Sequence, residues 1–425
     1  MSKTQKDAPS MTSPPATATT SPEIDAYSDA IKDHPQDATL YNNRGVAYHK
    51  HKAWQRAIED YTKAITLAPD NASFYSNRAF SHARAQAFQR AIEDWSSAIA
   101  LQPDHAPHYC RRADTYHAVG DRLRAIENYT KAIAIAPDNA DYYGKRASAY
   151  VRKGDKGDRL RAIADYGKAL EIEPDNPILY NNRARTYYSR GDYKQAIDDY
   201  AKAIALAPED ATLYYHRGDA YHGAGEKEKA IADYSKAIAL NPHDVSFYNG
   251  RANAYVKKGD KGDRLRAIAD YSKALEIEPD NPILYNNRGN TYYSRGDDAQ
   301  ALHDYNRAIE LNPSYGVAYQ NRAYLHNRME HIEEALADFT RAIEESAKEV
   351  TPAESLYTNR AVMYGKLERW DEALADCDRA IAINPREAVI YGYRSTAYRH
   401  LGREQEAQHD QETARSLTDK ARHDT

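Results

Sequence analysis

The sequence contains only two cysteines, Cys110 and Cys377, among 425 residues. Two thiols so far apart exclude a disulfide framework, and this is typical of proteins from a reducing compartment. No apolar run approaches the ~20 residues that a membrane-spanning helix needs, and no signal-peptide core is visible. We therefore expect a cytoplasmic protein without membrane contact.

Signals of catalysis are also missing. The sixteen histidines are scattered, and pairs such as His49 and His51 lack Cys or carboxylate partners at metal-ligand spacing. There is no phosphate-binding glycine loop and no nucleophile elbow. We expect no catalytic residue, metal, cofactor or small-molecule substrate. The net charge of −5 also disfavours general nucleic-acid binding.

Tyrosine, in contrast, is abundant, with 36 residues against five phenylalanines. Residues 282–315 contain two stretches whose apolar residues recur at spacings of three and four, the pattern of amphipathic helices. Gly296 separates the stretches with a turn, and Pro313 ends the second. Because such a hairpin cannot bury its apolar stripes alone, copies of it must stack on one another.

Copies of this segment fill most of the chain. The tyrosine at its fourth position recurs in eleven places, most often 34 residues apart: Tyr41, Tyr75, Tyr109, Tyr143, Tyr180, Tyr214, Tyr248, Tyr285, Tyr319, Tyr357 and Tyr391. With small residues at positions eight, twenty and twenty-seven and Pro at thirty-two, the pattern resembles the tetratricopeptide repeat. The resemblance covers about residues 23–418. It implies an all-α solenoid of helix-turn-helix repeats, wound as a right-handed superhelix with the first helices on the concave side.

The predicted organisation has four parts. Residues 1–22 form a disordered tail rich in Ser, Thr and Pro, residues 23–37 a capping helix, residues 38–418 the array, and residues 419–425 a C-terminal tail. The repeats are placed at 38–71, 72–105, 106–139, 140–176, 177–210, 211–244, 245–281, 282–315, 316–353, 354–387 and 388–418. The fourth and seventh carry an extra triplet, which we place in the turn. The sequences around these two triplets are nearly identical and lie 105 residues apart, which indicates duplication of a three-repeat block.

Position seven is Arg in every repeat, and position twenty-three of the second helix is Asp in ten of them. Aligned arginines could bind phosphate or nucleic acid. We instead predict an Arg–Asp pair that joins the two helices of each repeat. In the third repeat Arg112 faces Asn128, so the pair there should be weaker.

Position six, on the expected concave side, is Asn in six repeats: Asn43, Asn77, Asn182, Asn287, Asn321 and Asn359. This pattern is similar to the asparagine ladder in the repeat domain of O-linked N-acetylglucosamine transferases, which implies that the amides clamp the backbone of an extended peptide. An amide suits this role because it offers two donors and an acceptor. The alternative is a solvated residue that was copied with the repeat.

The same surface is predicted to carry basic and aromatic side chains beside few acids. These candidate peptide-binding residues are Arg84, Arg111, Lys145, Arg152, Arg185, Lys257 and Arg328, with Tyr188, Tyr215 and Tyr293. Its acids are Asp114, Asp141 and Asp219. A basic, aromatic surface favours extended acidic peptides over single-stranded nucleic acid, which remains the alternative ligand.

We therefore predict a non-catalytic scaffold or adaptor whose partner is a protein or peptide. Two alternatives stay open: a self-assembling structural array, and a repeat subunit of a larger complex. The sequence does not define the oligomeric state.

Overall fold

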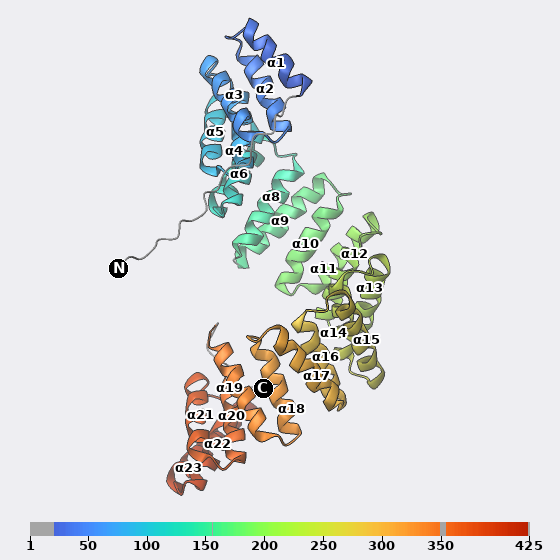
Figure 1. Ribbon diagram of the computed structural model, residues 1–425, viewed down its shortest axis with the longest axis vertical. Coiled ribbons are helices and arrows are strands. Elements are labelled where there is room, and N and C mark those ends of the chain that lie inside the picture. Colours follow the sequence, from blue (N-terminus) through green and yellow to red (C-terminus); the bar gives the residue numbers. More distant parts are fainter. Residues whose placement is uncertain (1–20, 155, 349–353, 424–425) are drawn as a thin grey trace, which may run out of the picture. The chain divides into compact units, whose positions relative to one another are not determined.

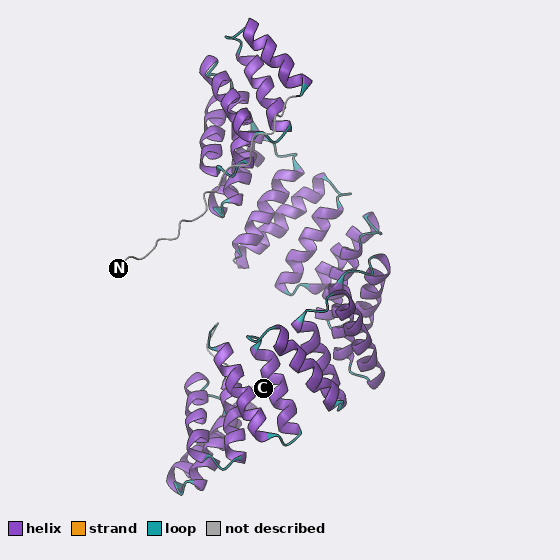
Figure 2. Cartoon of the chain, in the orientation of Figure 1, coloured by secondary structure: helices purple, strands orange, loops and turns teal. Residues whose placement is uncertain are grey.

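The computed structural model describes residues 21–154, 156–348 and 354–423. Within these ranges every regular element is an α-helix (Figure 2), which confirms the all-α prediction. The chain divides into two compact units, residues 1–207 and 208–425. Residues 1–20 of the predicted disordered tail lie outside the described residues.

The helices alternate between first and second members of the repeats (Figure 1), and each first helix begins at the residue where the repeat count begins. The first helices are α2 (Ala38–Lys50), α4 (Ala72–Arg84), α6 (Ala106–Ala118), α8 (Ala140–Lys153), α10 (Pro177–Arg190), α12 (Ala211–Gly223), α14 (Val245–Lys258), α16 (Pro282–Arg295), α18 (Gly316–Arg328), α20 (Glu354–Lys366) and α22 (Ala388–His400). The second helices are α3 (Trp54–Leu67), α5 (Phe88–Leu101), α7 (Arg122–Ile135), α9 (Lys156–Ile172), α11 (Tyr193–Leu206), α13 (Lys227–Leu240), α15 (Lys261–Ile277), α17 (Asp298–Leu311), α19 (Ile332–Ser346), α21 (Trp370–Ile383) and α23 (Glu404–His423). The helix α1 (Pro22–Asp33) precedes the repeats in the chain and packs on α2.

The helix ends follow local sequence chemistry. Asn176 precedes α10, and its side-chain oxygen accepts hydrogen bonds from the N–H groups of Ile178 and Leu179, which otherwise lack partners in the first turn. Pro177 occupies the first helical position, where the missing N–H costs nothing. Gly191 ends the helix with φ of 85°, a left-handed conformation that glycine adopts without strain.

The extra triplets of the fourth and seventh repeats do not lie in the turns, so that prediction was wrong. They lengthen the second helices instead, because α9 and α15 contain 17 residues each, against 14 in α17. Near the start of α9, Asp158 is almost fully buried and pairs with Lys153 at 3.1 Å and Arg161 at 3.0 Å. This anchor holds the additional helical turn against α8.

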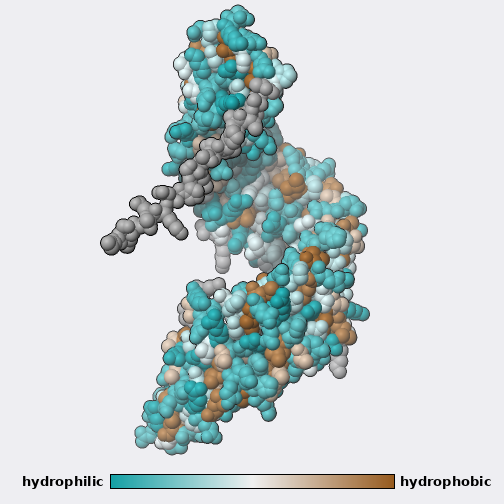
Figure 3. Space-filling model, viewed as in Figure 1, coloured by the Kyte–Doolittle hydropathy of each residue, from teal (hydrophilic) through white to brown (hydrophobic). Residues whose placement is uncertain are grey.

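The core of each unit is a ribbon of small and aromatic side chains between consecutive helices. In α17, Ala301, Tyr305 and Ala308 are 1 % exposed or less. A Cβ added to Gly289 of α16 would lie 2.8 Å from a ring carbon of Tyr305, so the two helices approach at van der Waals contact. The outer surface of each unit in Figure 3 is mostly hydrophilic, with apolar side chains scattered over it.

Candidate functional site

The Arg–Asp pairs join the two helices of a repeat as predicted. The guanidinium Nε of position seven donates to the aspartate of position twenty-three at 2.6 to 2.9 Å in ten repeats. In the third repeat Arg112 donates to Asn128 at 2.8 Å, and burial lowers the pKa of that arginine. The aligned arginines therefore serve the fold, and the phosphate-binding alternative for them is wrong.

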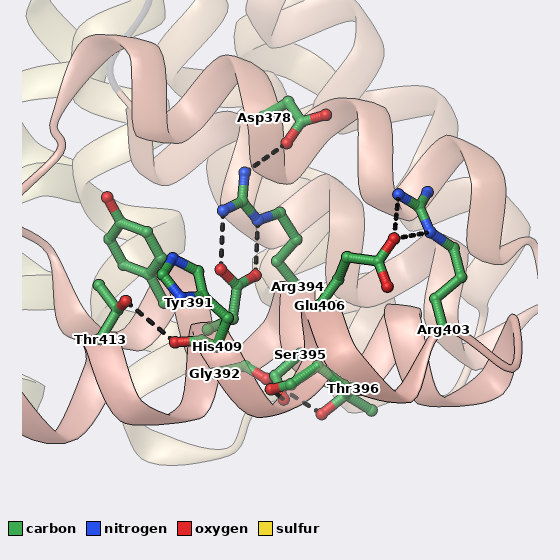
Figure 4. Close-up of polar contacts among 12 residues, drawn as sticks. Asp378, Tyr391, Gly392, Arg394, Ser395, Thr396, Arg403, Glu406, His409 and Thr413 are labelled. Carbon is green, nitrogen blue, oxygen red and sulfur yellow. Dashed lines mark hydrogen bonds and ion pairs between the residues drawn. The ribbon is translucent and has the colours of Figure 1, made fainter.

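Most of these arginines also bond to the second helix that precedes their repeat. Nη1 of Arg288 donates to the Ser272 hydroxyl at 2.9 Å, and Nη1 of Arg78 donates to the Thr62 hydroxyl at 3.0 Å. Figure 4 shows the last of these arginines, Arg394, between its paired carboxylate and Asp378 of the preceding second helix. Nine of the eleven arginines make such a bond, and each of these stabilises both its own repeat and the stacking on the preceding helix.

Arg183 makes no such inter-repeat bond among the described residues, because the facing position is Gly167. A Cβ on that glycine would lie 3.7 Å from Nη1 of Arg183, so a side chain fits there. The duplicated copy of the block has Ser272 at this position. We expect Gly167→Ser to stabilise α9 and α10 by about 1–2 kcal/mol, through higher helix propensity and one new hydrogen bond.

Local free energies from native-state hydrogen exchange would measure this effect. Gly167→Ala is the control, because it supplies the helix propensity without the hydroxyl. Equal gains from serine and alanine would show that no new bond to Arg183 forms.

A second set of contacts ties the core to the first-helix face, which we define as positions two, five, six, nine, twelve and thirteen of the first helices. Core tyrosines at position twenty-four reach this face. Tyr129 donates to Asp114 at 2.8 Å, and Tyr234 donates to Asp219 at 2.7 Å. Where the core residue is Trp95, position nine is Phe80, and the rings meet edge to face at 4.9 Å. The covariation of these two positions was a signal that the sequence reasoning missed.

Asp219 of this face has a perturbed pKa. Burial raises its pKa to about 6, although hydrogen bonds from Tyr234 and Tyr215 partly oppose the shift. Since the folded pKa exceeds the usual value near 3.9, the stabilising contribution of this group is complete below about pH 4 and is lost as pH rises through 6.

Asp219→Asn should remove this pH dependence, because an amide oxygen still accepts from Tyr234 but carries no charge. At pH 7.5 we expect the variant to stabilise α12 and α13 by about 2 kcal/mol, whereas at pH 4 the two proteins should be equally stable. Hydrogen exchange at both pH values, corrected for intrinsic rates, measures the difference. A gain of the same size at both pH values would contradict the assignment.

The six ladder asparagines lie half-buried, and four of them are already engaged between repeats. Nδ2 of Asn77 donates to Asn42 at 2.8 Å, and Nδ2 of Asn321 donates to Asn286 at 2.8 Å. Asn287 and Asn359 bond likewise to the preceding repeat, at 3.4 and 2.8 Å. Asn43 accepts a bond from Asn42 at 3.3 Å, and the side chain of Asn182 has no partner among the described residues. One donor of most ladder amides is therefore used within the array.

The predicted basic residues divide into two groups. Arg111 and Lys145 both pair with Asp114, at 3.3 and 3.2 Å, and Arg328 pairs with Asp298. The other four are exposed and have no side-chain hydrogen bond or ion pair with any described residue: Arg84, Arg152, Arg185 and Lys257. The first three lie in the unit of residues 1–207 and Lys257 in the other.

The three predicted tyrosines differ in what they can offer a ligand. Tyr215 packs against Phe247 at 5.2 Å and so belongs to the core between α12 and α14. Arg328 covers the ring of Tyr293 at 3.7 Å. Tyr188 is 40 % exposed and presents part of its ring to solvent.

Several hollows follow the first-helix face. One of about 350 Å³ lies between α8 and α10, where Arg152, Asn182 and Arg185 contribute to its lining. A second of about 250 Å³ is lined by Phe80, Arg84 and Arg111, among others. Predicted residues of the first-helix face thus meet in shared hollows rather than standing alone.

In the described residues, no three His, Cys, Asp or Glu side chains are grouped so that they could hold a metal ion. Nor does any helix of this part combine the length and apolar character needed to cross a membrane.

The repeats match sequence models of one family along most of the array. Models described as tetratricopeptide repeat match residues 38–71, 106–139, 140–176, 166–198, 282–315, 317–349 and 355–387, and one described as TPR repeat matches 184–225, 220–259 and 260–294. The chain belongs to the tetratricopeptide repeat family. This fold is typically a non-catalytic scaffold for protein interactions, and its members bind protein or peptide partners.

Solved structures resemble the chain at low identity. A tetratricopeptide repeat protein from Parabacteroides merdae is 22 % identical with a TM-score of 0.47, and the match covers 61 % of this chain and 98 % of that one. Yeast Tom70 is 17 % identical with a TM-score of 0.44, covering 89 % and 92 %. YrrB, described as having an unusual peptide-binding site, is 21 % identical with a TM-score of 0.39, covering 44 % and 95 %. No curated protein sequence matches the chain.

Proposed function

We propose that this chain is an adaptor that holds extended, acidic segments of partner proteins against its first-helix face. The observation that carries this proposal is the imbalance of free charge on that face. Arg84, Arg152, Arg185 and Lys257 are exposed without an internal partner, whereas Asp114 and Asp219 accept hydrogen bonds from core tyrosines. Positive charge therefore remains available to a ligand, and this favours an acidic one.

The ladder amides also support peptide binding, although with fewer free hydrogen-bonding groups than unpaired asparagines would offer. An asparagine that donates once to its neighbour keeps a second N–H and acceptor capacity on its oxygen. Removing all six amides would also break inter-repeat bonds such as Asn77 to Asn42, so that change confounds binding with stacking. Asn43, whose bond to Asn42 lies within one helix, and Asn182 can be replaced without loss of an inter-repeat bond.

We therefore test the proposal by removing positive charges from the first-helix face and measuring peptide affinity. A phage-displayed library of unstructured peptides is panned on the wild-type protein, and affinities of enriched peptides are measured. We expect acidic peptides that lose at least about tenfold in affinity when the four unpaired residues of the first-helix face are replaced by glutamine. The matched control removes four charges from exposed second-helix residues: Lys63, Arg90, Lys131 and Lys194.

Equal losses in the two variants would mean that only overall charge matters, and enrichment of neutral peptides would defeat the acidic specificity. Single-stranded oligonucleotides should bind weakly. A strong oligonucleotide complex whose affinity falls steeply with salt would favour the nucleic-acid alternative.

A further inference from the structure

The hollow between α8 and α10 on the first-helix face is lined by two arginines and by no acidic side chain. It measures about 350 Å³, and its polar lining includes Ser148 and Arg152 of α8 and Asn182 and Arg185 of α10, with Tyr166 of α9 behind them. These three helices lie side by side in one unit (Figure 1). Two guanidinium groups from consecutive repeats therefore face one space.

Both arginines are free for a ligand. Arg152 and Arg185 are exposed and make no side-chain hydrogen bond or ion pair with any described residue. The neighbouring arginines of the same helices behave differently, since Arg146 pairs with Asp165 and Arg183 with Asp199. Two unneutralised guanidinium groups carry two charges and up to ten N–H donors, more than a single carboxylate can satisfy.

The duplicated block supplies an internal comparison. Residues 140–192 and 245–297 differ at ten positions, and six of these lie on the first-helix face: Asp141/Ser246, Gly144/Asn249, Lys145/Gly250, Ser148/Asn253, Arg152/Lys257 and Arg185/Asn290. The neutral lining residues Tyr166, Asn182 and Thr186 are unchanged in the copy. Most differences between the two copies therefore lie on this face. The copy keeps a positive charge at only one of the two arginine positions, because Lys257 replaces Arg152 and Asn290 replaces Arg185.

We propose that this hollow binds the phosphate group of a phosphorylated serine or threonine in the bound segment. This proposal rests on the proposed function, because the first-helix face must hold the segment that carries the phosphate. A phosphate monoester carries −1.5 to −2 charges at pH 7 and three strong acceptor oxygens, which match two arginines and the adjacent hydroxyl and amide donors.

The experiment compares three peptide libraries that share random flanking positions and differ at one fixed residue, which is phosphoserine, glutamate or serine. Each is passed over the immobilised full chain. We expect at least tenfold stronger retention of the phosphoserine library than of the glutamate library. The variant that combines Arg152→Lys with Arg185→Asn should lose this difference, whereas Arg84→Gln, which removes an unpaired charge outside the hollow, should keep it.

The variant retains the fold by design, because lysine and asparagine occupy the same positions in the internal copy. The reverse change, Lys257→Arg with Asn290→Arg, should create a second site and double the number of phosphopeptides bound per chain in calorimetric titration. Both outcomes together would establish the hollow as the site.

Other outcomes would contradict the phosphate site, and they distinguish its failure from a failure of the proposed adaptor function. Equal retention of phosphoserine and glutamate libraries would leave an acidic-segment adaptor without a phosphate site. Retention of none of the libraries would defeat both proposals. An equal loss in Arg84→Gln would assign the effect to overall charge, and tighter binding of a single-stranded oligonucleotide to the same arginines would assign the hollow to nucleic acid.

Discussion

Replacing Arg288 by alanine is expected to lower the local stability of α16 and α17 by about 3 kcal/mol. The guanidinium donates to both oxygens of Asp304 at 2.8 Å, and that carboxylate is 1 % exposed. Without the arginine, a buried negative charge would remain unpaired, and the bond to the Ser272 hydroxyl would disappear as well. Hydrogen exchange of the amides in these helices measures the loss.

The control lies in the same helix. Arg295 pairs with Asp297 at 3.3 Å, with both side chains about 30 % exposed, so Arg295→Ala should cost less than about 1 kcal/mol. Adding Asp304→Ala to the Arg288 variant should recover part of the stability, because no orphaned charge then remains. If Arg288→Ala cost no more than Arg295→Ala, the pair would not be the structural element that we describe.

The fold could be read from the sequence because its signals are repeated. The apolar periodicity recurs in all eleven copies, a turn glycine in seven of them and a proline at position thirty-two in nine, so departures at single positions do not matter. The Arg–Asp pairs were predictable for the same reason, since both partners recur at fixed positions. The triplet of α9 was misplaced because Gly157 suggests a turn, whereas burial of Asp158 against Lys153 stabilises another helical turn.

The site was less predictable, because the sequence shows which residues share a face but not which of them are already paired. Arg111 and Lys145 counted as free charge, yet both pair with Asp114. The role of Asp114 itself depends on Tyr129, fifteen residues away in another helix. Such pairings depend on three-dimensional packing between helices, and position counting treats every copy alike.

Replacing Ala301 by leucine should destabilise α16 and α17 by about 1–3 kcal/mol through overpacking. Ala301 is fully buried and belongs to the cluster of Tyr305 and Leu325, so a larger side chain must displace rings or separate helices. Hydrogen exchange should show faster opening in this repeat and in α18, which packs on α17.

Ala299 of the same helix is exposed, so Ala299→Leu makes the same chemical change without burial and should shift stability by less than about 0.5 kcal/mol. Equal behaviour of the two leucines would mean that the helices can move apart at little cost. Neighbouring repeats share one core, so a strained repeat should also weaken the contact of α17 with α18. The spread of the effect into α18 would therefore measure how strongly adjacent repeats of this unit are coupled.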